Sequence, residues 1–512
     1  MGFARVASRA QLGLAAPRVD VEVHLGSGLP TFSIVGLPQT AVKESKDRVR
    51  AALANSGFEF PAGRITVNLS PADLPKEGCR YDLPIALGIL LASLQIRMTE
   101  DRLANSEFYG ELGLAGELKP IRGVLLAAAH AAREGRALIV PGANVVEARL
   151  AAPGAIHGAD TLLGVCALAQ ARERQADADA APARAADLVD RPGLDLAEVR
   201  GQAAAKRALI IAAAGGHSLL LLGPPGTGKS MLAQRLPGLL PALDGSDALD
   251  VAAIASVSSR GFVAANYGKR PFRSPHHTAS ATAIIGGGPQ ARPGEVSLAH
   301  RGVLFLDELP EFNRTVLESL REPLETGVVA ISRAAAQVEY PARFQLVAAM
   351  NPCPCGFLGE PSGNCRCAPP EIARYRARIS GPLLDRIDLR VTVPTLSSAE
   401  LFDDAAEPNA RLTSEQAAAQ VCTARARQFE RAGALNADLA ARELQIHCAL
   451  DRHCRGLMAH AREKLELSAR SVHRVLRVAR TIADLGAPGI QAGSPIRTAH
   501  LAEALQLRRA IS

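Results

Sequence analysis

The sequence predicts an α/β protein whose C-terminal part is helical. Short apolar runs bounded by glycine or proline, such as the four leucines at 219–222, indicate buried strands. Amphipathic stretches with helical spacing lie between such runs, for example at 124–133. Hydrophobic residues make up 48% of the 512 residues and aromatic residues only 4%, so alanine and leucine supply most of the core and favour helices.

Composition divides the chain into three units joined by one linker. A first α/β unit is expected at 1–168, a second at 193–395 and a helical domain at 396–512. Residues 169–192 are rich in Ala, Asp and Arg with few large apolar side chains, which is typical of a linker. In the first unit we expect strands at 19–25, 31–36, 64–69 and 137–141, and helices at 40–56, 83–94 and 124–133. The second unit should begin with a helix over 195–214.

The second unit is organised around a glycine-rich turn. Residues 219–230 read LLLLGPPGTGKS, which places G-x-x-x-x-G-K-S between an apolar strand and a helical pattern. Glycines allow consecutive backbone N–H groups to point into one concavity that fits a phosphate. Lys229 would reach the β- and γ-phosphates, and Ser230 would bind Mg²⁺. The predicted nucleotide-binding residues are Gly223, Pro224, Pro225, Gly226, Thr227, Gly228, Lys229, Ser230 and Met231.

A second motif supplies two acidic groups. Residues 303–308 read VLFLDE, an apolar strand that ends in a pair of carboxylates. Asp307 would share Mg²⁺ with Ser230. Glu308 is placed to polarise an attacking water. Together with the phosphate-binding turn upstream, this pair predicts an ATPase that uses ATP and Mg²⁺.

A Gly-, Pro- and Arg-rich insertion separates these two motifs. It contains RPFRSPHHTAS at 270–280 and a further Arg292. Two interpretations remain open: a loop that places Arg270, Arg273 and Arg292 near DNA phosphates, or a scaffold that shapes the ATP site. The adjacent His276 and His277 are expected to have structural or hydrogen-bonding roles, because neighbours in sequence rarely point at one metal ion.

Two further segments follow the acidic motif. Residues 328–340 predict a β-hairpin with Arg333 near its tip, and 344–351 predict a buried strand that ends at Asn351. The loop 351–368 then places Cys353, Cys355, Cys365 and Cys367 as two C-x-C pairs. Four thiolates this close fit a structural zinc site, and a loop of free thiols is the alternative.

The lack of a recognisable targeting signal predicts a cytoplasmic protein, and this bears on the role of the cysteines. We find no long apolar run that would cross a membrane and no convincing signal peptide. The nine cysteines are therefore not expected to form a disulfide framework, and no membrane partner is expected. Cys448 and Cys454 are expected in the core.

Net charge concentrates at the C-terminal end. The chain carries +7 overall, and residues 411–512 contain sixteen Lys or Arg against nine Asp or Glu. Such an excess suits a polyanion such as nucleic acid. A helical domain with solvated arginine-rich faces is the alternative.

Two parts of the first unit carry a resemblance to a known family: PKEG at 75–78 with DLPIALG at 82–88, and GELGLAGELKPIRGV at 110–124. On these motifs the first unit resembles the proteolytic domain of Lon-type proteases, a ribosomal S5 domain 2-like fold. The expected serine is replaced by Cys79-Arg80-Tyr81, and the expected lysine by Leu125-Leu126. Since a nucleophile needs its base, the resemblance implies the fold without peptidase activity.

Six stretches between 223 and 485 carry a second resemblance: GPPGTGKS, RPFRSPHHTAS, GGGPQARPGEVSLAHRGVLFLDELPEF, NPCPCG, SGPLLDRIDL and ARTIADL. Together they resemble the magnesium-chelatase-like AAA+ ATPases of the ComM/YifB type, most specifically within 195–395. The resemblance implies a P-loop AAA+ core with a parallel sheet, a C-terminal α-helical lid and a hexameric ring that acts on branched or single-stranded DNA. The resemblance to ComM implies, in addition, that such a ring drives branch migration during natural transformation.

The resemblance also implies roles for single residues. Asn351 corresponds to sensor 1, which orients the attacking water. Arg386 would be an arginine finger that reaches a neighbouring subunit, with an internal ion pair to Asp385 or Asp388 as the alternative. Arg470 would be sensor 2, with Arg474 as the runner-up. Arg333 would touch DNA, by analogy with hairpins of related helicases.

Two functions are consistent with these observations. The first is a hexameric ATP-driven DNA motor, which explains the basic C-terminal region and a proteolytically silent first domain. The second is the motor subunit of a metal-chelatase-type complex that acts on a protein partner. The extra first domain and the C-x-C pairs favour the DNA motor. A Lon-like protease is disfavoured by the missing serine and lysine.

Overall fold

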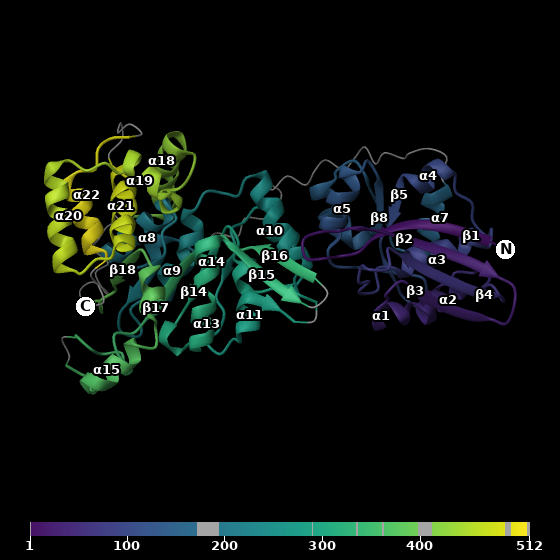
Figure 1. Cartoon of the computed structure of the whole chain (residues 1–512), viewed down its shortest axis with the longest axis horizontal. Helices are drawn as coiled ribbons and strands as arrows, with labels where there is room; N and C mark the ends of the chain where they lie inside the picture. Colours follow the sequence, from purple (N-terminus) through teal and green to yellow (C-terminus); the bar gives the residue numbers. More distant parts are fainter. Residues whose placement is uncertain are drawn as a thin grey trace.

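We describe the protein from a computed structural model, which defines residues 2–170, 194–288, 290–333, 336–360, 363–397, 412–486 and 493–508. The molecule is elongated, with an N-terminal domain at one end, an α/β domain in the middle and a helical domain at the other end (Figure 1). Residues 171–192 of the predicted linker and 398–411 of the predicted helical domain lie outside the described residues.

The N-terminal domain is built on a seven-stranded mixed sheet in the order β3-β4-β2-β1-β5-β8-β9. The long β1–β2 pair is antiparallel, and alternating valines of β2 (Val19, Val21 and Val23) are buried under the helices. Its strands are β1 Gly2–Arg9, β2 Arg18–Gly26, β3 Thr31–Val35, β4 Arg64–Ser70, β5 Ser106–Phe108, β8 Ala137–Pro141 and β9 Ile156–Ala159, with the short pair β6 Glu111–Leu112 and β7 Leu118–Lys119. These strands include the four predicted ones and add β1, β5, β6, β7 and β9.

The three predicted helices of this domain are present, and three helices that were not predicted are added. The predicted helix at 40–56 is interrupted at Glu44, and the last helix reaches Gln170, two residues beyond the predicted boundary. The helices are α1 Thr40–Lys43, α2 Ser45–Asn55, α3 Asp82–Ala92, α4 Glu100–Ala104, α5 Val124–Arg133, α6 Val145–Ala151 and α7 Leu162–Gln170.

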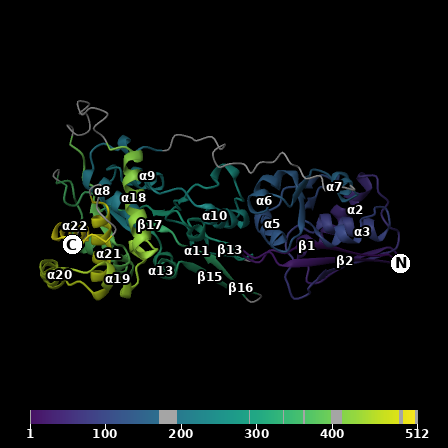
Figure 2. The ribbon, with the colours of Figure 1, turned by 90° about the horizontal axis from the view of Figure 1, so that it is seen from above.

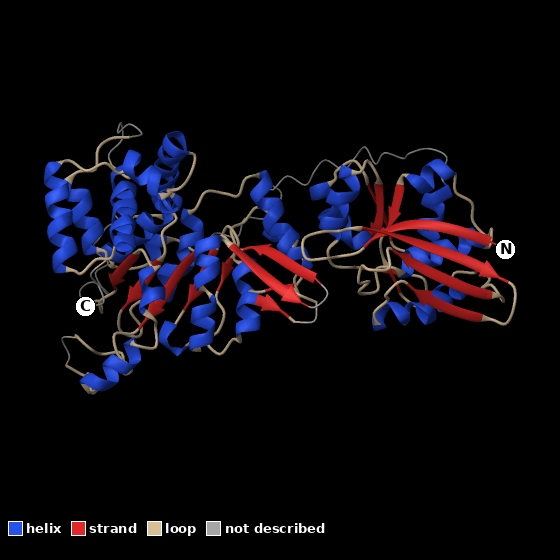
Figure 3. Ribbon diagram, in the orientation of Figure 1, coloured by secondary structure: helices blue, strands red, loops and turns tan. Residues whose placement is uncertain are grey.

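The central domain contains a separate five-stranded parallel sheet in the order β11-β14-β17-β10-β18 (Figure 3). Its strands are β10 Leu219–Leu222, β11 Phe272–Arg273, β14 Val303–Leu306, β17 Gln345–Met350 and β18 Leu389–Thr392. The strands β10, β14 and β17 are buried throughout, as their apolar sequences predict. Because β17 lies between β10 and β14, the residue after β17 lies between the glycine-rich turn and the acidic pair.

The predicted helix over 195–214 is wrong in its first part. A short 3₁₀ turn at Leu196–Glu198 is followed by a bend, and α8 begins only at Ala203. Gln202 adopts a left-handed backbone with φ of 54°, which a helix cannot continue through. The other helices of this domain are α9 Lys229–Leu239, α10 Gly245–Val257, α11 Ala281–Ile285, α12 Glu295–Leu298, α13 Arg314–Ser319, α14 Arg321–Thr326, α15 Pro369–Arg376 and α16 Gly381–Asp385.

Two antiparallel hairpins lie outside the central sheet. The predicted hairpin at 328–340 is confirmed as β15 Val328–Arg333 with β16 Ala336–Pro341, and Arg333 pairs with Ala336 next to the turn. The side chain of Arg333 lies outside the described residues. The smaller hairpin, β12 Gly286–Gly287 with β13 Arg292–Pro293, is formed by the insertion between the two nucleotide motifs.

The N-terminal and central domains share one apolar core. Leu125 and Leu126 of α5 belong to the same buried cluster as Val257 of α10, and α5 contacts α10 (Figure 2). Ser256 at the end of α10 donates a hydrogen bond to the buried carboxyl of Glu147. The loop after β1 also reaches the hairpin, because a Cβ on Gly13 would lie 2.2 Å from Cγ1 of Val338. The first domain is therefore packed firmly against the second.

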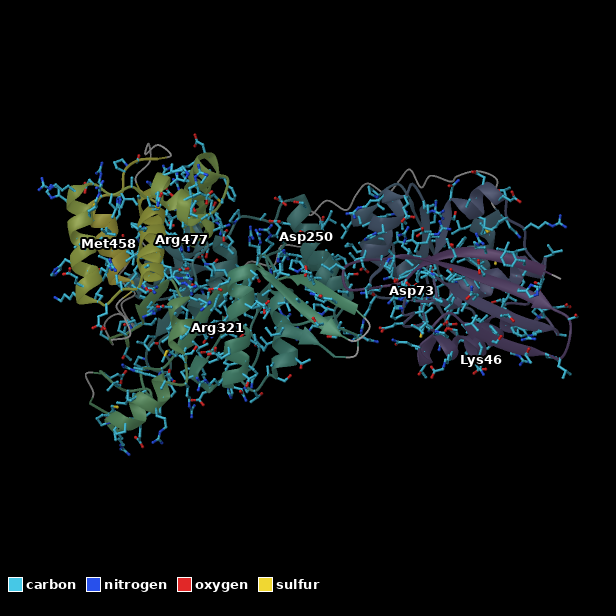
Figure 4. The ribbon with its side chains drawn as sticks, viewed as in Figure 1. Lys46, Asp73, Asp250, Arg321, Met458 and Arg477 are labelled. Atoms are coloured by element: carbon cyan, nitrogen blue, oxygen red, sulfur yellow. The ribbon has the colours of Figure 1, made fainter. Side chains whose placement is uncertain are left out.

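The helical domain comprises α18 Ser414–Ala432, α19 Ala441–His447, α20 Arg452–Lys464, α21 Ala469–Asp484 and α22 Thr498–Gln506. Its core continues from α8, since α18 and α21 both contact that helix. Many of its arginines point inward. Arg425 donates to the carbonyl of Ala213, and Arg477, labelled on α21 in Figure 4, donates to that of Leu439. Much of the C-terminal positive charge therefore serves internal packing and is not free for a polyanion.

Candidate functional site

The glycine-rich turn has the geometry of a phosphate cradle. A Cβ on Gly223 would lie 2.2 Å from the carbonyl oxygen of Val393, so the backbone can pass there only without a side chain. Gly228 has φ of 89° and is followed directly by α9, which begins at Lys229. The N-terminus of an eleven-residue helix therefore faces the turn, where its unpaired N–H groups favour an anion.

Lys229 is folded back onto its own loop. Its Nζ donates to the carbonyl oxygens of Gly223 and Pro224, each at 2.7 Å, and to Oδ1 of Asn351 at 3.1 Å. The side chain is buried, and this desolvation lowers its pKa, while the charges of Asp307 and Glu308 oppose that effect. The ammonium group thus lies in the region where phosphates would bind. Its present acceptors are carbonyl and amide oxygens, which phosphate oxygens could replace.

Three predicted residues meet at the carboxyl ends of β10, β14 and β17. Oγ of Ser230 donates to Oδ2 of Asp307 at 2.7 Å, which places the hydroxyl and the carboxylate as neighbouring oxygen ligands. Such a pair fits Mg²⁺, which prefers one or two protein oxygens together with phosphate and water. Asn351 completes the group through its contact with Lys229. The sequence assigned these residues separately, and parallel strands bring them to one edge.

Glu308 has a partner that the sequence analysis did not assign to it. Nδ1 of His277 lies 3.2 Å from Oε2 of Glu308, and the side chains are 31% and 55% exposed. Glu308 also has a left-handed backbone with φ of 53°, which is uncommon for a residue with a side chain. The contact follows from the fold: β11 pairs with β14, so residues shortly after β11 reach the same edge as Asp307 and Glu308.

The arginine assigned to a neighbouring subunit lies at the opposite edge of the sheet. Arg386 precedes Asp388, whose Oδ2 accepts from the N–H of Ser218 at 3.0 Å, just before β10 and β18 begin. The four-residue strand β10 is about 13 Å long and separates this edge from the glycine-rich turn. Arg386 therefore cannot approach the phosphates that its own chain would bind.

Arg386 and Arg470 both face Glu325 at the end of α14. Nη2 of Arg386 donates to Oε1 of Glu325, and Nη1 of Arg470 lies 4.0 Å from the same oxygen. Arg386 thus forms an ion pair with Glu325. The alternative prediction was an internal ion pair with Asp385 or Asp388, and the structure shows neither. Arg474 instead binds Asp388. The side chain of Arg470 is 78% exposed and that of Arg474 is 20% exposed, which leaves Arg470 the more accessible of the two.

The four loop cysteines cluster as predicted. Sγ of Cys353 lies 3.4 Å from that of Cys355 and 3.8 Å from that of Cys365, and with Cys367 all four sulfurs lie within 4.8 Å of one another. Tetrahedral zinc with bonds of about 2.3 Å sets its sulfurs about 3.8 Å apart, so the residues fit this ion. N–H groups of Phe357 and Arg366 lower the pKa of Cys355 to about 6, whereas burial and the neighbouring thiols raise the pKa of Cys365.

The cysteine loop also touches the glycine-rich turn. It follows Asn351 directly, and a Cβ on Gly356 would lie 2.6 Å from Cδ of Pro225. Gly356 has φ of 88°, so both its conformation and its close approach require glycine. Any ion that fixes this loop would therefore also support the turn.

The arginines of the insertion are largely committed to internal contacts. Arg270 donates to the carbonyl oxygens of Pro241 and Arg301, each at 2.6 Å. Arg273 makes a two-pronged ion pair with Glu295 at 2.5 and 2.7 Å. Both contacts favour the scaffold interpretation for this pair of residues. Arg292 lies in β13, half-buried, and its charge acts on Tyr340 of the hairpin β15–β16.

Sequence comparison places this arrangement in a family. The family described as "Magnesium chelatase, subunit ChlI" matches residues 195–401, and its C-terminal part matches residues 411–508. The family "Subunit ChlI of Mg-chelatase" matches residues 21–144. The chain is 48% identical to the competence protein ComM of Haemophilus influenzae over 99% of this chain and 98% of that protein. The chain belongs to the ComM/YifB type of magnesium-chelatase-like AAA+ proteins.

Other members of the ComM/YifB type show the same extent of similarity. The YifB proteins of Salmonella typhimurium and Escherichia coli are each 47% identical over 99% of this chain and 97% of their own length. The similarity therefore includes the N-terminal domain as well as the AAA+ core. Among the described residues, no helix of this ComM/YifB-type protein has the length and apolar composition needed to cross a bilayer.

Proposed function

We propose that this protein hydrolyses ATP in a hexameric ring and uses the energy to remodel branched or single-stranded DNA. One observation carries the proposal: the phosphate-binding and acidic groups lie at one edge of the central sheet, and the candidate arginines lie at the other. A single chain thus carries the phosphate-binding half of an ATPase site at one edge and the arginine half at the other. The two halves can meet only between neighbouring subunits. The relative named for competence supports a role in the integration of incoming DNA.

The residues suggest a division of labour in hydrolysis. Lys229 would exchange the carbonyls of Gly223 and Pro224 for phosphate oxygens, and Ser230 with Asp307 would hold Mg²⁺. Glu308 would accept a proton from the attacking water, which Asn351 would orient. Arg386 and Arg470 would leave Glu325 to neutralise charge that develops on the neighbour's γ-phosphate.

We further propose that the N-terminal domain is a Lon-like fold without peptidase activity. At the positions where that family carries its catalytic pair, Arg80 donates to the hydroxyl of Tyr109 and to Gln11. Leu125 and Leu126 are buried in the core shared with the central domain. These side chains are engaged in packing, and they leave no base for a nucleophile. The domain would instead act as a support for the ring.

We propose a structural zinc ion for the four-cysteine loop. The cluster is compact, and the loop contacts both the glycine-rich turn and Asn351. Zinc here would fix the relative position of Asn351 and the turn without taking part in the chemistry.

The deciding experiment measures the ATPase rate with and without single-stranded, duplex and four-way-junction DNA, at low and high salt. Stimulation that weakens as salt rises would support a motor with phosphate contacts. Lys229→Ala is the control, because it removes the phosphate ligand and should reduce the rate to background. An ATPase that responds to none of these DNAs would contradict the DNA motor and favour a chelatase-type motor with a protein partner.

A further inference from the structure

A cavity of about 360 Å³ lies between the end of α10 and the insertion that follows β11. Its polar walls come from Arg260 after α10, Ser274 and His276 after β11, and Glu295 at the start of α12. Cavities of this size bind small ligands, or single groups of larger ones, where a few polar side chains converge. None of the residues that line it is assigned to ATP or Mg²⁺.

Arg260 brings an uncompensated positive charge to this cavity. Its side chain is exposed and forms no hydrogen bond or ion pair within the described part of the chain. Glu295, the acidic residue of the wall, is already engaged, because its two oxygens accept from Arg273 at 2.5 and 2.7 Å. The guanidinium of Arg260 is therefore free to bind an anion from outside the chain.

Two neutral donors accompany this charge. Nδ1 of His276 lies 2.9 Å from the hydroxyl and 3.4 Å from the backbone N–H of Thr278. Because Nδ1 accepts from that N–H, the proton of the neutral ring resides on Nε2, which is then a donor. The exposed hydroxyl of Ser274 in the same wall can donate as well. The cavity thus selects a ligand with a negative charge and acceptor oxygens.

The turn that carries Arg260 is anchored on both sides. The N–H of Gly261 donates to the carbonyl of Ser258 at 3.2 Å and closes the turn. Just before it, Ser256 donates to the buried carboxyl of Glu147 in the N-terminal domain. Arg260 therefore extends from a fixed turn where two domains meet, so little backbone freedom is lost when an anion binds.

We propose that this cavity holds a backbone phosphate of bound DNA, with Arg260 as its charged ligand and His276 and Ser274 as neutral donors. A phosphodiester carries one negative charge and only acceptor oxygens, which matches this set of groups. The inference rests on the proposed function, because DNA is the phosphodiester that the protein is proposed to remodel. It assigns the phosphate contact to an arginine without an internal partner, in place of Arg270 and Arg273, which have such partners.

The test measures binding of a fluorescent single-stranded oligonucleotide by anisotropy, with a non-hydrolysable ATP analogue present, over a series of salt concentrations. Arg260→Ala should weaken binding about tenfold and reduce the slope of log K against log salt by about 0.7, as expected for one lost phosphate contact. His276→Ala should weaken binding about threefold and leave the slope unchanged, because the lost donor is neutral. Arg64→Ala is the matched control and should behave as wild type, since Arg64 is also exposed but lies in β4 of the N-terminal domain.

The DNA contact is ruled out if Arg260→Ala keeps the affinity and the salt slope of wild type. It is also ruled out if Arg64→Ala reduces the slope equally, since net charge would then be responsible. An Arg260→Ala variant that loses calorimetric binding of inorganic phosphate but keeps DNA binding would assign the cavity to free phosphate. Should Arg260→Ala not bind the ATP analogue, Arg260→Gln replaces it with the same expectations. Wild type that binds no DNA would instead contradict the proposed function, whatever the variants do.

Discussion

Arg474 of α21 donates a hydrogen bond of 2.5 Å to the carboxylate of Asp388 and another of 3.0 Å to the carbonyl oxygen of Arg386. The helical domain is thereby tied to the segment that carries the candidate finger. Burial alone would raise the pKa of Asp388, but hydrogen bonds and charge from His217 and Arg474 hold it well below its usual range. Asp388 is thus a buried carboxylate that depends on its partners.

Arg474→Ala and Arg470→Ala should therefore differ. Loss of Arg474 leaves the buried carboxylate of Asp388 short of a partner and should lower the free energy of unfolding by about 3 kcal/mol. Loss of the exposed Arg470 should change stability by less than about 0.5 kcal/mol but lower kcat, as expected for a sensor. Denaturant unfolding and ATPase assays on both variants measure these effects. Equal stability of the two variants would contradict the structural role of Arg474.

Arg386→Ala should inactivate rings without preventing ATP binding. Its guanidinium lies at the edge opposite the glycine-rich turn, so each substituted subunit would spoil the site of its neighbour. We expect a loss of about 10³-fold in kcat for the pure variant. Mixed with Lys229→Ala, which is also expected to be inactive, Arg386→Ala should regain activity, because a neighbouring pair of the two variants forms a site with an intact turn and an intact arginine. No regained activity in such mixtures would show that Arg386 does not act between subunits.

Loss of zinc should weaken ATP binding more than it slows the chemical step. The cysteine loop packs on Pro225 through Gly356, so an unfixed loop would loosen the turn. Protein as purified should contain one zinc per chain, and Cys353→Ser should abolish it and raise KM for ATP about tenfold. Cys422→Ser is the control, because Cys422 is exposed and outside the cluster. Metal analysis that finds no zinc in wild type would refute the site.

Lowering the pH should reduce the stability of the folded chain through His300. Burial, together with the charges of Arg301 and Arg343, lowers the pKa of this imidazole from 6.5 to about 4. Below pH 6.5 the unfolded chain takes up a proton that the folded chain does not, so stability present above 6.5 is lost as pH falls toward 4. Between pH 7 and 5 the loss should be about 2 kcal/mol.

His300→Asn checks this pH dependence. Nδ1 of His300 accepts the N–H of Arg343 at 3.1 Å, and an asparagine oxygen could replace that acceptor without titrating. Unfolding curves at pH 7 and 5 should therefore differ less for this variant than for wild type. Substitution of the exposed His24 should leave the difference unchanged. An unchanged difference for His300→Asn as well would rule out His300 as the source.

The sequence predicted best what short local patterns specify. The strands before Gly223 and Asp307 are recognisable because each is an apolar run followed directly by a motif. The phosphate-binding turn and the acidic pair both require a buried strand before them. The β15–β16 hairpin followed from alternation and its turn. Ser230 and Asp307 were assigned from their motifs and Asn351 from the resemblance to AAA+ ATPases, and the shared edge of the parallel strands explains why the three residues meet.

Contacts between distant segments were harder to foresee. The break at Gln202 depends on a left-handed residue in an otherwise helical pattern. Arg270 and Arg273 were indistinguishable in sequence from phosphate ligands, and only folding showed Glu295 and backbone carbonyls within their reach. The C-terminal arginines likewise find internal partners through helix packing that charge counts do not reveal. Glu325 was missed because nothing local marks it as the partner of Arg386.

The apolar core shared by α5 and α10 bears on how this protein could be dissected. Deleting the first domain would uncover Val257 and would remove the loop at Gly13 that supports Val338 in the hairpin. A truncated chain would therefore tend to self-associate through the newly exposed apolar surface. Replacing Leu126 by a charged residue in the full chain would separate the domains while leaving both present, and would report on their communication more faithfully than truncation.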